Sequence, residues 1–352
     1  MAQNGGPAED RRPLASSPRR RWWWLLVAPA WLLFVPLWCA WGLGQIYRDQ
    51  YAGWERFFHL PAPVVAAAGL GLLALCAVSR RRRLGLVAGL FVAWPLAIVV
   101  LSDNHWLRPR IPPSGPSPSG PLRLLDWNVC HGLGGWANVL ATLDRERPDI
   151  LVLAEYAPGD SRQFQHHLES LNTLLQSWGW EVPHVVPSGS VLIASRFPLL
   201  HTERLRLPCS DCVLVDFEDD AGSSLRVLVL DLPSGLRAHR DPLLRKVNAI
   251  ITTTQPDLVV GDFNAVRQAT QLQPPPQGYR HAYDAAGAGW SYTWPVPFPV
   301  LAIDQCLVGP RIEPLDYTLG TGASDHRWQR LDFRPIRSEQ NSSARVAHVD
   351  DD

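Results

Sequence analysis

Three long apolar segments without a charged residue dominate the front third of the chain, at Trp22–Leu43, Leu60–Ser79 and Leu84–Ser102. A helix needs about 20 apolar residues to cross a bilayer, and each segment is close to that length. Any one of them alone would also suit a buried helix of a soluble protein, but three in succession between arginine clusters would not. A cleavable signal peptide explains only the first segment, whose apolar part is too long for one. We therefore expect a three-helix transmembrane region over residues 22–105.

The arginine clusters predict how these helices are oriented. Arg19–Arg21 precede the first segment, Arg80–Arg83 separate the second from the third, and the loop Gln45–His59 is nearly neutral. Because cytoplasmic loops carry the excess of Lys and Arg, both clusters should stay inside, with residues 1–21 as a basic cytoplasmic tail. The chain beyond the third segment then lies outside. Lys246 is the only lysine, a bias typical of GC-rich bacterial genomes. The predicted location is a bacterial plasma membrane, with the C-terminal domain on its extracytoplasmic side.

A change of composition separates this region from the rest of the chain. Residues 106–121 form a Pro/Ser/Gly-rich spacer, which cannot build a core and favours extended backbone. Residues 1–121 contain 13 Arg and 5 acidic residues, a net charge of +8, whereas the remainder contains 20 basic and 28 acidic residues, a net charge of −8. A folded soluble domain is expected over 122–337, followed by a disordered tail at 338–352.

Strand-like and helix-like segments are interspersed along this domain. Apolar runs of strand type recur between short helices with a helical apolar period, and we find no internal repeat of solenoid length. Strands of both the fully apolar and the alternating kind, mixed with a few helices, indicate an α/β or α+β sandwich of sheets. The expected strands lie at 122–129, 149–153, 182–186, 191–195, 213–217, 225–230, 291–294, 301–308 and 327–333, and a further strand is expected within the stretch 256–264.

Several of these strands end in side chains that carry oxygen or imidazole groups. In Gly261-Asp262-Phe263-Asn264, alternate side chains of an extended strand share a face, so the carboxylate and the carboxamide point the same way. Singly, each such residue has a simpler explanation as a helix cap, a surface acid, a salt bridge or a turn. Together they offer hard oxygen ligands and one imidazole, which suit Mg²⁺ or Mn²⁺. The residues are Asn128, Glu155, Asp262, Asn264, Asp304, Asp325 and His326.

The motifs around these residues resemble those of a known family. Trp127-Asn128-Val129, the strand ending in Glu155, the Gly261–Asn264 motif, Ala302-Ile303-Asp304 and Ser324-Asp325-His326 occur in the order and approximate spacing of the endonuclease/exonuclease/phosphatase superfamily. That superfamily includes deoxyribonuclease-I-like enzymes, abasic-site endonucleases, inositol polyphosphate 5-phosphatases and neutral sphingomyelinases. The resemblance covers roughly residues 122–334. It implies a four-layer α/β/β/α sandwich with the site at one edge of the two sheets.

The resemblance also implies a metal site and the chemistry of a phosphoesterase. Glu155 would be the principal ligand of Mg²⁺ or Mn²⁺, with Asn128 beside it and Asp325 helping to hold the metal or water. A divalent ion neutralises phosphate oxygens and lowers the pKa of bound water. Cys130 departs from the family pattern, because some relatives have an acidic ligand at that point.

Five residues would carry the catalytic roles. Asp262 and Asn264 would position the attacking water and the phosphate, and Asp304 would orient His326 against the phosphate. Asp231 stands where the family usually has a histidine that contacts phosphate or acts as a general acid. An aspartate supplies no positive charge, and it donates a proton at neutral pH only if its pKa is strongly raised. Two hypotheses result: a phosphoesterase that relies on metal and His326, or a catalytically impaired relative that binds a phosphorylated ligand or partner.

The remaining features leave the substrate open. Trp290 and Tyr292 fall where relatives place a substrate-facing loop, so they are candidates for substrate binding, with core packing as the alternative. Cys209 and Cys212 form either a local disulfide or free thiols. The substrate would be a lipid head group, a small phosphoester or a nucleic acid, and the net charge of −8 favours the first two. The lipid bilayer is the other expected partner, and no protein partner can be predicted.

Overall fold

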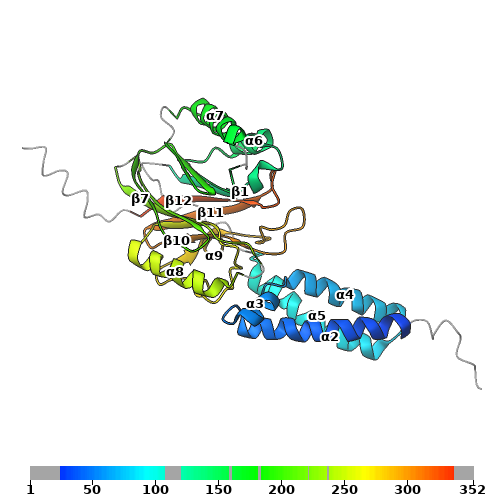
Figure 1. Cartoon of the computed structure of the whole chain (residues 1–352). Coiled ribbons are helices and arrows are strands. Elements are labelled where there is room, and N and C mark those ends of the chain that lie inside the picture. Colours follow the sequence, from blue (N-terminus) through cyan, green and yellow to red (C-terminus); the bar gives the residue numbers. More distant parts are fainter. Residues whose placement is uncertain are drawn as a thin grey trace, which may run out of the picture.

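A computed structural model describes residues 24–107, 120–157, 161–180, 184–220, 222–235 and 238–336. The predicted basic tail at 1–21, nearly all of the predicted spacer at 106–121 and the predicted C-terminal tail at 338–352 lie outside these residues. Within the described part, an N-terminal helical region is followed by a layered domain of sheets and helices (Figure 1).

The helical region consists of α2 (Trp24–Tyr47), α3 (Ala52–Phe58), α4 (Ala62–Val78) and α5 (Arg82–Ala97), which continues as a π-helix over Ile98–Asp103. Residues 25–47 and 82–103 are long and apolar enough to cross a membrane, and α3 with α4 adds a third span if that pair, bent by 62°, is one. The helix α4 is shorter than the expected second segment, Leu60–Ser79, because it begins only after Pro61. Large apolar side chains on the outside of this region, such as Leu33 and Leu90, are about three quarters exposed.

Two mixed sheets of six strands each form the centre of the domain. The first has the strand order β11-β12-β1-β2-β4-β3, and the second has the order β5-β6-β7-β8-β10-β9. Each sheet contains one parallel pair, β1 with β2 and β7 with β8, and the other pairs are antiparallel. The strands are β1 (Leu122–Asn128), β2 (Ile150–Ala154), β3 (His184–Ser188), β4 (Val191–Ser195), β5 (Leu199–Arg204), β6 (Asp211–Glu218), β7 (Ser224–Asp231), β8 (Leu258–Asp262), β9 (Arg280–His281), β10 (Asp304–Val308), β11 (Ile312–Gly320) and β12 (Trp328–Pro335).

Helices cover both outer faces of this pair of sheets (Figure 1). The helices α6 (Trp136–Glu146) and α7 (Ser161–Ser177) bury their apolar faces on the first sheet. On the second sheet lies α8 (Arg240–Thr254), whereas the short α9 (Ala282–Ala286) contributes Ala282 and Tyr283 to the core between the sheets. The predicted four-layer α/β/β/α sandwich is confirmed. Because each parallel pair needs a crossover, α6 and α8 are the connections that place helices outside the sheets.

The central strands are apolar throughout because both of their faces are buried. In β2, Ile150 and Val152 point into the space between the sheets, whereas Leu151 and Leu153 point toward α6 and α7. The strand β8 behaves in the same way, with Val260 between the sheets. Such continuous apolar runs are typical of strands covered on both sides.

One expected strand is absent, because residues 291–294 form no strand apart from an isolated bridge between Trp294 and Leu301. Three strands were not expected, namely the two-residue β9 and the longer β5 and β11. The two longer ones, β5 and β11, are an edge strand with an exposed face and an edge strand that contains Pro314, so neither shows an apolar pattern.

Candidate active site

Three aspartates lie side by side at one edge of the second sheet. Asp231 ends β7, Asp262 ends β8 and Asp304 begins β10, and the strand register pairs Asp262 with Asp231 on one side and with Asp304 on the other. Val229 and Val260, two residues before Asp231 and Asp262, belong to the core between the sheets. Because side chains alternate along a strand, the aspartates continue the inward-facing rows. The alternation that builds the core therefore also brings the carboxylates together at the edge of the sandwich.

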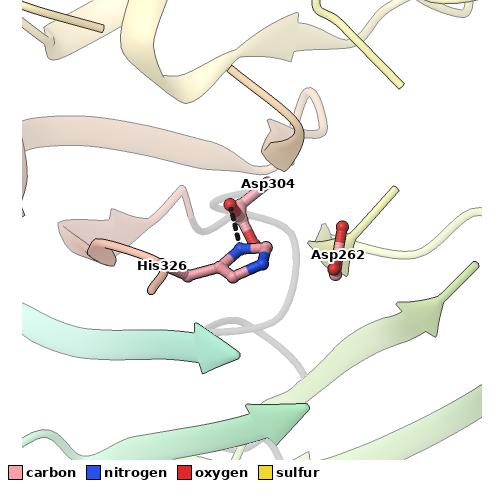
Figure 2. A group of neighbouring side chains, drawn as sticks. All are labelled: Asp262, Asp304 and His326. Carbon is pink, nitrogen blue, oxygen red and sulfur yellow. Dashed lines mark hydrogen bonds and ion pairs between the residues drawn. The ribbon is translucent and has the colours of Figure 1, made fainter. Parts of the chain in front are cut away.

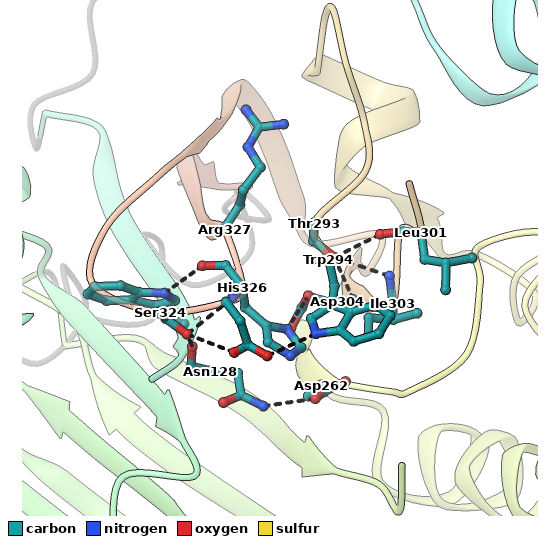
Figure 3. Close-up of polar contacts among 12 residues, drawn as sticks. Asn128, Asp262, Thr293, Trp294, Leu301, Ile303, Asp304, Ser324, His326 and Arg327 are labelled. Atoms are coloured by element: carbon teal, nitrogen blue, oxygen red, sulfur yellow. Dashed lines mark hydrogen bonds and ion pairs between the residues drawn. The ribbon is translucent and has the colours of Figure 1, made fainter. Parts of the chain in front are cut away.

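The first sheet faces these aspartates with Asn128, at the end of β1. Its Nδ2 donates to Asp262 Oδ2 over 3.0 Å, and its Oδ1 accepts from the backbone N–H of Cys130 over 2.9 Å. Figure 3 shows the bond between Asn128 and Asp262, and both side chains are buried. Two residues earlier, the buried Asp126 accepts from Gln329 Nε2 over 2.5 Å. A hydrogen bond between the two sheets thus holds the site together.

The imidazole of His326 lies against Asp304 and beside Asp262 (Figure 2). Its Nδ1 is 3.0 Å from Asp304 Oδ2 and 3.1 Å from Oδ1, and both side chains are buried. Burial lowers the pKa of His326, but the charge and hydrogen bond of Asp304, together with Asp262 and Asp325, raise it to about 10. The ring is therefore an imidazolium at neutral pH, with Nδ1–H held by Asp304 and Nε2–H available as a donor.

The turn that carries His326 is tied to β1. Trp127 Nε1 donates to the backbone oxygen of His326 over 3.1 Å, and Ser324 Oγ donates to the backbone oxygen of Asn128 over 2.7 Å (Figure 3). Asp325 Oδ2 accepts from Trp294 Nε1 over 3.0 Å. Asp325 is thus placed next to His326, with one of its oxygens already bonded to the indole.

Glu155 approaches the aspartates from the end of β2. One carboxylate oxygen from each of Glu155, Asp231 and Asp262 lies within 4.8 Å of the others. Glu155 has a positive φ of 49°, an uncommon conformation for a residue with a side chain. Its carboxylate is partly exposed and lies 3.5 Å from His131 Nε2, while Asp231 accepts a short hydrogen bond from Ser190 Oγ. This end of the site is the more open one.

The charges of this group favour a divalent cation. Burial, followed by the charge of Asp304, raises the pKa of Asp262 well above its ordinary value. Burial also raises the pKa of Asp231, to about 6, with Glu155 adding to the effect and the Ser190 bond opposing it. Several carboxylates thus face one another with a single imidazolium among them. Carboxylate oxygens that converge in this way are the ligands that Mg²⁺ and Mn²⁺ prefer, so the donor set fits such an ion.

Asn264 completes the group through its backbone. It has a positive φ of 47°, and its N–H donates to Asp262 Oδ1 over 2.8 Å. Its Nδ2 donates to the backbone oxygen of Leu232 over 2.7 Å, and its own backbone oxygen accepts a short hydrogen bond from Arg240 Nε. The conformation of this loop therefore depends on Arg240, at the start of α8.

The structure does not bring Trp290 and Tyr292 to this group. Tyr292 is buried and donates through its hydroxyl to Asp103 Oδ2 over 2.5 Å. Trp290 packs against the helical region, with its ring 5.9 Å from that of Trp106. Both rings therefore pack between the domain and the helices, as expected from the alternative in which they serve core packing and do not bind substrate.

Sequence reasoning missed several residues that shape the site. Asp126 precedes Asn128 by two positions on β1, so strand alternation alone could have placed it on the same face. No comparable signal marks Ser190 and His131, which touch the acidic group from loops, or Arg240, which supports Asn264 from a helix. Cys209 and Cys212 are free thiols here.

Comparisons with known proteins show the family and the fold of this chain. The sequence model of the endonuclease/exonuclease/phosphatase family matches residues 127–326, more than half of the chain. A search of curated protein sequences found no match. Among solved structures, a humanised D. rerio TDP2 with 14 mutations is 19% identical and superposes with a TM-score of 0.50, covering 61% of this chain and 100% of that one. An endonuclease/exonuclease/phosphatase from Beutenbergia cavernae is 19% identical, with a TM-score of 0.49 over 62% of this chain and 72% of that one.

A mannosyl-6-phosphatase from Bacteroides thetaiotaomicron is 14% identical, with a TM-score of 0.47 over 60% of this chain and 99% of that one. At these identities the likeness concerns the fold. The family match includes Asn128, Glu155, Asp262, Asp304 and His326. The chain therefore belongs to the endonuclease/exonuclease/phosphatase family.

Proposed function

We propose that this protein is a membrane-tethered phosphoesterase that depends on a divalent metal and acts outside the cytoplasm. The observation that carries the proposal is the buried His326–Asp304 pair beside the converging carboxylates of Glu155, Asp231 and Asp262. Such a pair presents positive charge to a phosphate, and the carboxylates supply ligands for a cation. Phosphoryl transfer needs mainly these two elements, because it depends on positioning and charge stabilisation.

Each residue has a role that follows from its position. His326 would donate from Nε2 to a phosphate oxygen, because its Nδ1 is held by Asp304. Asp262, which accepts from both Asn128 and the N–H of Asn264, would orient and deprotonate the attacking water.

Glu155, Asn128 and Asp325 would hold the metal ion or its water. Mg²⁺ or Mn²⁺, when bound, would neutralise phosphate oxygens and lower the pKa of water. The Glu155 side chain is 29% exposed, which suits an ion that enters from solvent.

A second candidate function is motivated by Asp231. It occupies the place of a cationic residue in relatives, and its pKa of about 6 leaves it mostly ionised at neutral pH. A site with this change could bind a phosphorylated ligand without turnover.

Hydrolysis of bis-p-nitrophenyl phosphate by the full-length protein in detergent, with Mg²⁺ or Mn²⁺, tests the proposal. Glu155→Ala and His326→Ala should each lower the rate by about 100-fold or more. Glu203→Ala and His201→Ala, at exposed positions on β5, are matched controls that should keep the rate of the unmodified protein. Metal binding by the unmodified protein without any turnover would favour the second candidate function.

The proposed topology has its own test. Alkaline phosphatase fused after Ser119 should be active, because it would lie outside the cytoplasm. An inactive fusion in a well-expressed protein would contradict that orientation.

A further inference from the structure

Two exposed apolar side chains lie at the tips of loops beside the candidate site. Leu133 is 81% exposed on the loop between β1 and α6, and Phe298 is 80% exposed on the loop between Trp294 and Leu301. The Phe298 loop is closed at its base, where Trp294 and Leu301 exchange backbone hydrogen bonds of 3.0 and 2.9 Å. Single exposed apolar residues are common on protein surfaces, so it is the position of these two side chains beside the candidate site that points to a contact surface.

Both loops border the turn that carries His326. On one side, the backbone N–H of Val296 donates to the backbone oxygen of Asp325 over 2.7 Å. On the other, Gly134 lies so close to Ala323 that an added Cβ would overlap the alanine carbonyl. Leu133 and Phe298 therefore flank residues 323–326, and we call these two side chains the apolar rim.

The Phe298 loop is also fixed to the helical region. Trp290 Nε1 donates to the backbone oxygen of Pro299, next to Phe298, over 2.8 Å. Trp290 is packed against a buried cluster that includes Trp41 near the end of α2, Val65 in the first turn of α4 and Val99 beyond α5. These three positions lie at one end of the helical bundle, the end that meets the domain (Figure 1).

This end of the bundle has the composition of a membrane interface. Trp38, Trp41 and Trp94 form edge-to-face or tilted ring contacts there, with Trp41 fully buried and the other two partly buried. Trp106 is about half exposed just beyond the candidate span that ends at Asp103, and we call these four residues the tryptophan belt. Tryptophan side chains concentrate where a bilayer meets water. Because Pro299 is bonded to Trp290, the Phe298 side of the apolar rim is held next to this tryptophan belt.

From this arrangement we infer that the mouth of the site faces the outer surface of the membrane, with the rim inserted into it, and that the substrate is a phosphoester of a membrane lipid. The inference rests on the proposed function and narrows its substrate. A lipid phosphate lies at the depth of the head groups, next to the tryptophan belt. Confinement of enzyme and substrate to one surface raises the effective concentration of the substrate without any new contact.

Cross-linking in nanodiscs of phosphatidylethanolamine and phosphatidylglycerol tests the orientation of the full-length protein. A p-benzoylphenylalanine that replaces Phe298 should cross-link to lipid. The same residue in place of Leu200 should not, because Leu200, which is 54% exposed, lies at the opposite edge of the sandwich. Its neighbour Leu199 pairs with Phe217, which pairs with Leu225 near the start of β7, whereas the site is at the end of β7. Equal cross-linking from both positions would overturn the inference.

Paired substrates test the chemical class. Hexadecyl p-nitrophenyl phosphate in the nanodisc and ethyl p-nitrophenyl phosphate in solution share the reacting group and differ only in the alkyl chain. The unmodified protein should prefer the hexadecyl ester by kcat/KM. A Leu133→Ser/Phe298→Ser double variant should lose about tenfold or more of that preference, while Leu200→Ser keeps it.

The outcomes are distinguishable. A preference for the hexadecyl ester that is the same in the rim variant would overturn the role of the rim, and no preference in the unmodified protein would overturn the lipid substrate. Absence of metal-dependent turnover of both esters would instead refute the proposed function, whereas lipid cross-links from position 298 would still support a membrane-facing rim.

Discussion

Removal of the Glu55 carboxylate should destabilise the junction between the helical region and the domain. Glu55 belongs to α3, yet its side chain, which is 6% exposed, accepts from His239 Nδ1 over 2.8 Å, from the backbone N–H of Arg240 over 3.1 Å and from Arg240 Nη1 over 3.2 Å. Arg240 is almost as buried, with its side chain 10% exposed, and it also donates to the backbone oxygens of Ser234 and Asn264.

The expected magnitude follows from the burial of both partners. Glu55→Ala leaves the Arg240 guanidinium buried without a counterion, and such a change lowers the free energy of unfolding by about 3–5 kcal/mol. Glu55→Gln keeps a neutral acceptor and should lower it by about 2 kcal/mol. A Glu55→Leu/Arg240→Met double variant removes both charges, so it should be more stable than Glu55→Ala.

Urea unfolding of the full-length protein in detergent, followed by proteolysis of the unfolded fraction, measures these differences. Glu203→Ala is the control, because Glu203 is exposed on β5. Since Arg240 holds the Asn264 loop, Glu55→Ala should also lower kcat under conditions in which the protein remains folded. A change in the free energy of unfolding within about 0.5 kcal/mol of the control would refute the reasoning.

Three further predictions concern other parts of the domain. Asp231→Asn should weaken Mn²⁺ binding by about 10- to 100-fold in calorimetric titration, and an unchanged affinity would exclude Asp231 from the metal site. Gly261→Ala should prevent folding, seen as loss of soluble detergent-purified protein, because Gly261 has a φ of +139° and a Cβ would overlap the Leu230 carbonyl; Gly71→Ala, with open space around it, should be tolerated. Burial lowers the pKa of His281 from 6.5 to about 4, so a proton binds the unfolded chain more readily than the folded one. Between pH 6.5 and 4, the free energy of unfolding of the unmodified protein should therefore fall by about 3 kcal/mol more than that of His281→Gln. Parallel curves of unfolding free energy against pH for the two proteins would contradict this.

Most of the candidate site residues lie at or next to the end of a strand, where the sequence marks them, and the family resemblance assigned their roles. Asn264 and His326 instead lie in loops next to a strand. Strand alternation requires Asp262 to continue the inward row of Val260, and the same holds for Asp231 after Val229. Helices and strands with a buried face were also predictable, because the residues on that face are apolar and recur with the period of the element. The edge strands β5 and β11 show no such apolar pattern, and they were missed.

Other features depend on contacts between segments far apart in the chain. The pKa of His326 follows from the carboxylate of Asp304, which no local pattern connects to it. Trp290 and Tyr292 were assigned to a substrate loop by their position in the sequence, but the structure packs them against the helical region. No sequence pattern marks Glu55 in the nearly neutral loop Gln45–His59, although it is the buried partner of Arg240.

The sequence by itself determined the membrane-like helices, the sandwich and the set of acidic and imidazole groups, because hydrophobic period and strand-end chemistry are local properties of a chain. Only the tertiary structure decided that the helical region and the domain share a polar, buried junction, and that the apolar rim beside the site is fixed to the ends of the helices. The reason is physical: burial and charge pairing depend on which surfaces meet in space, and a linear pattern does not contain that information.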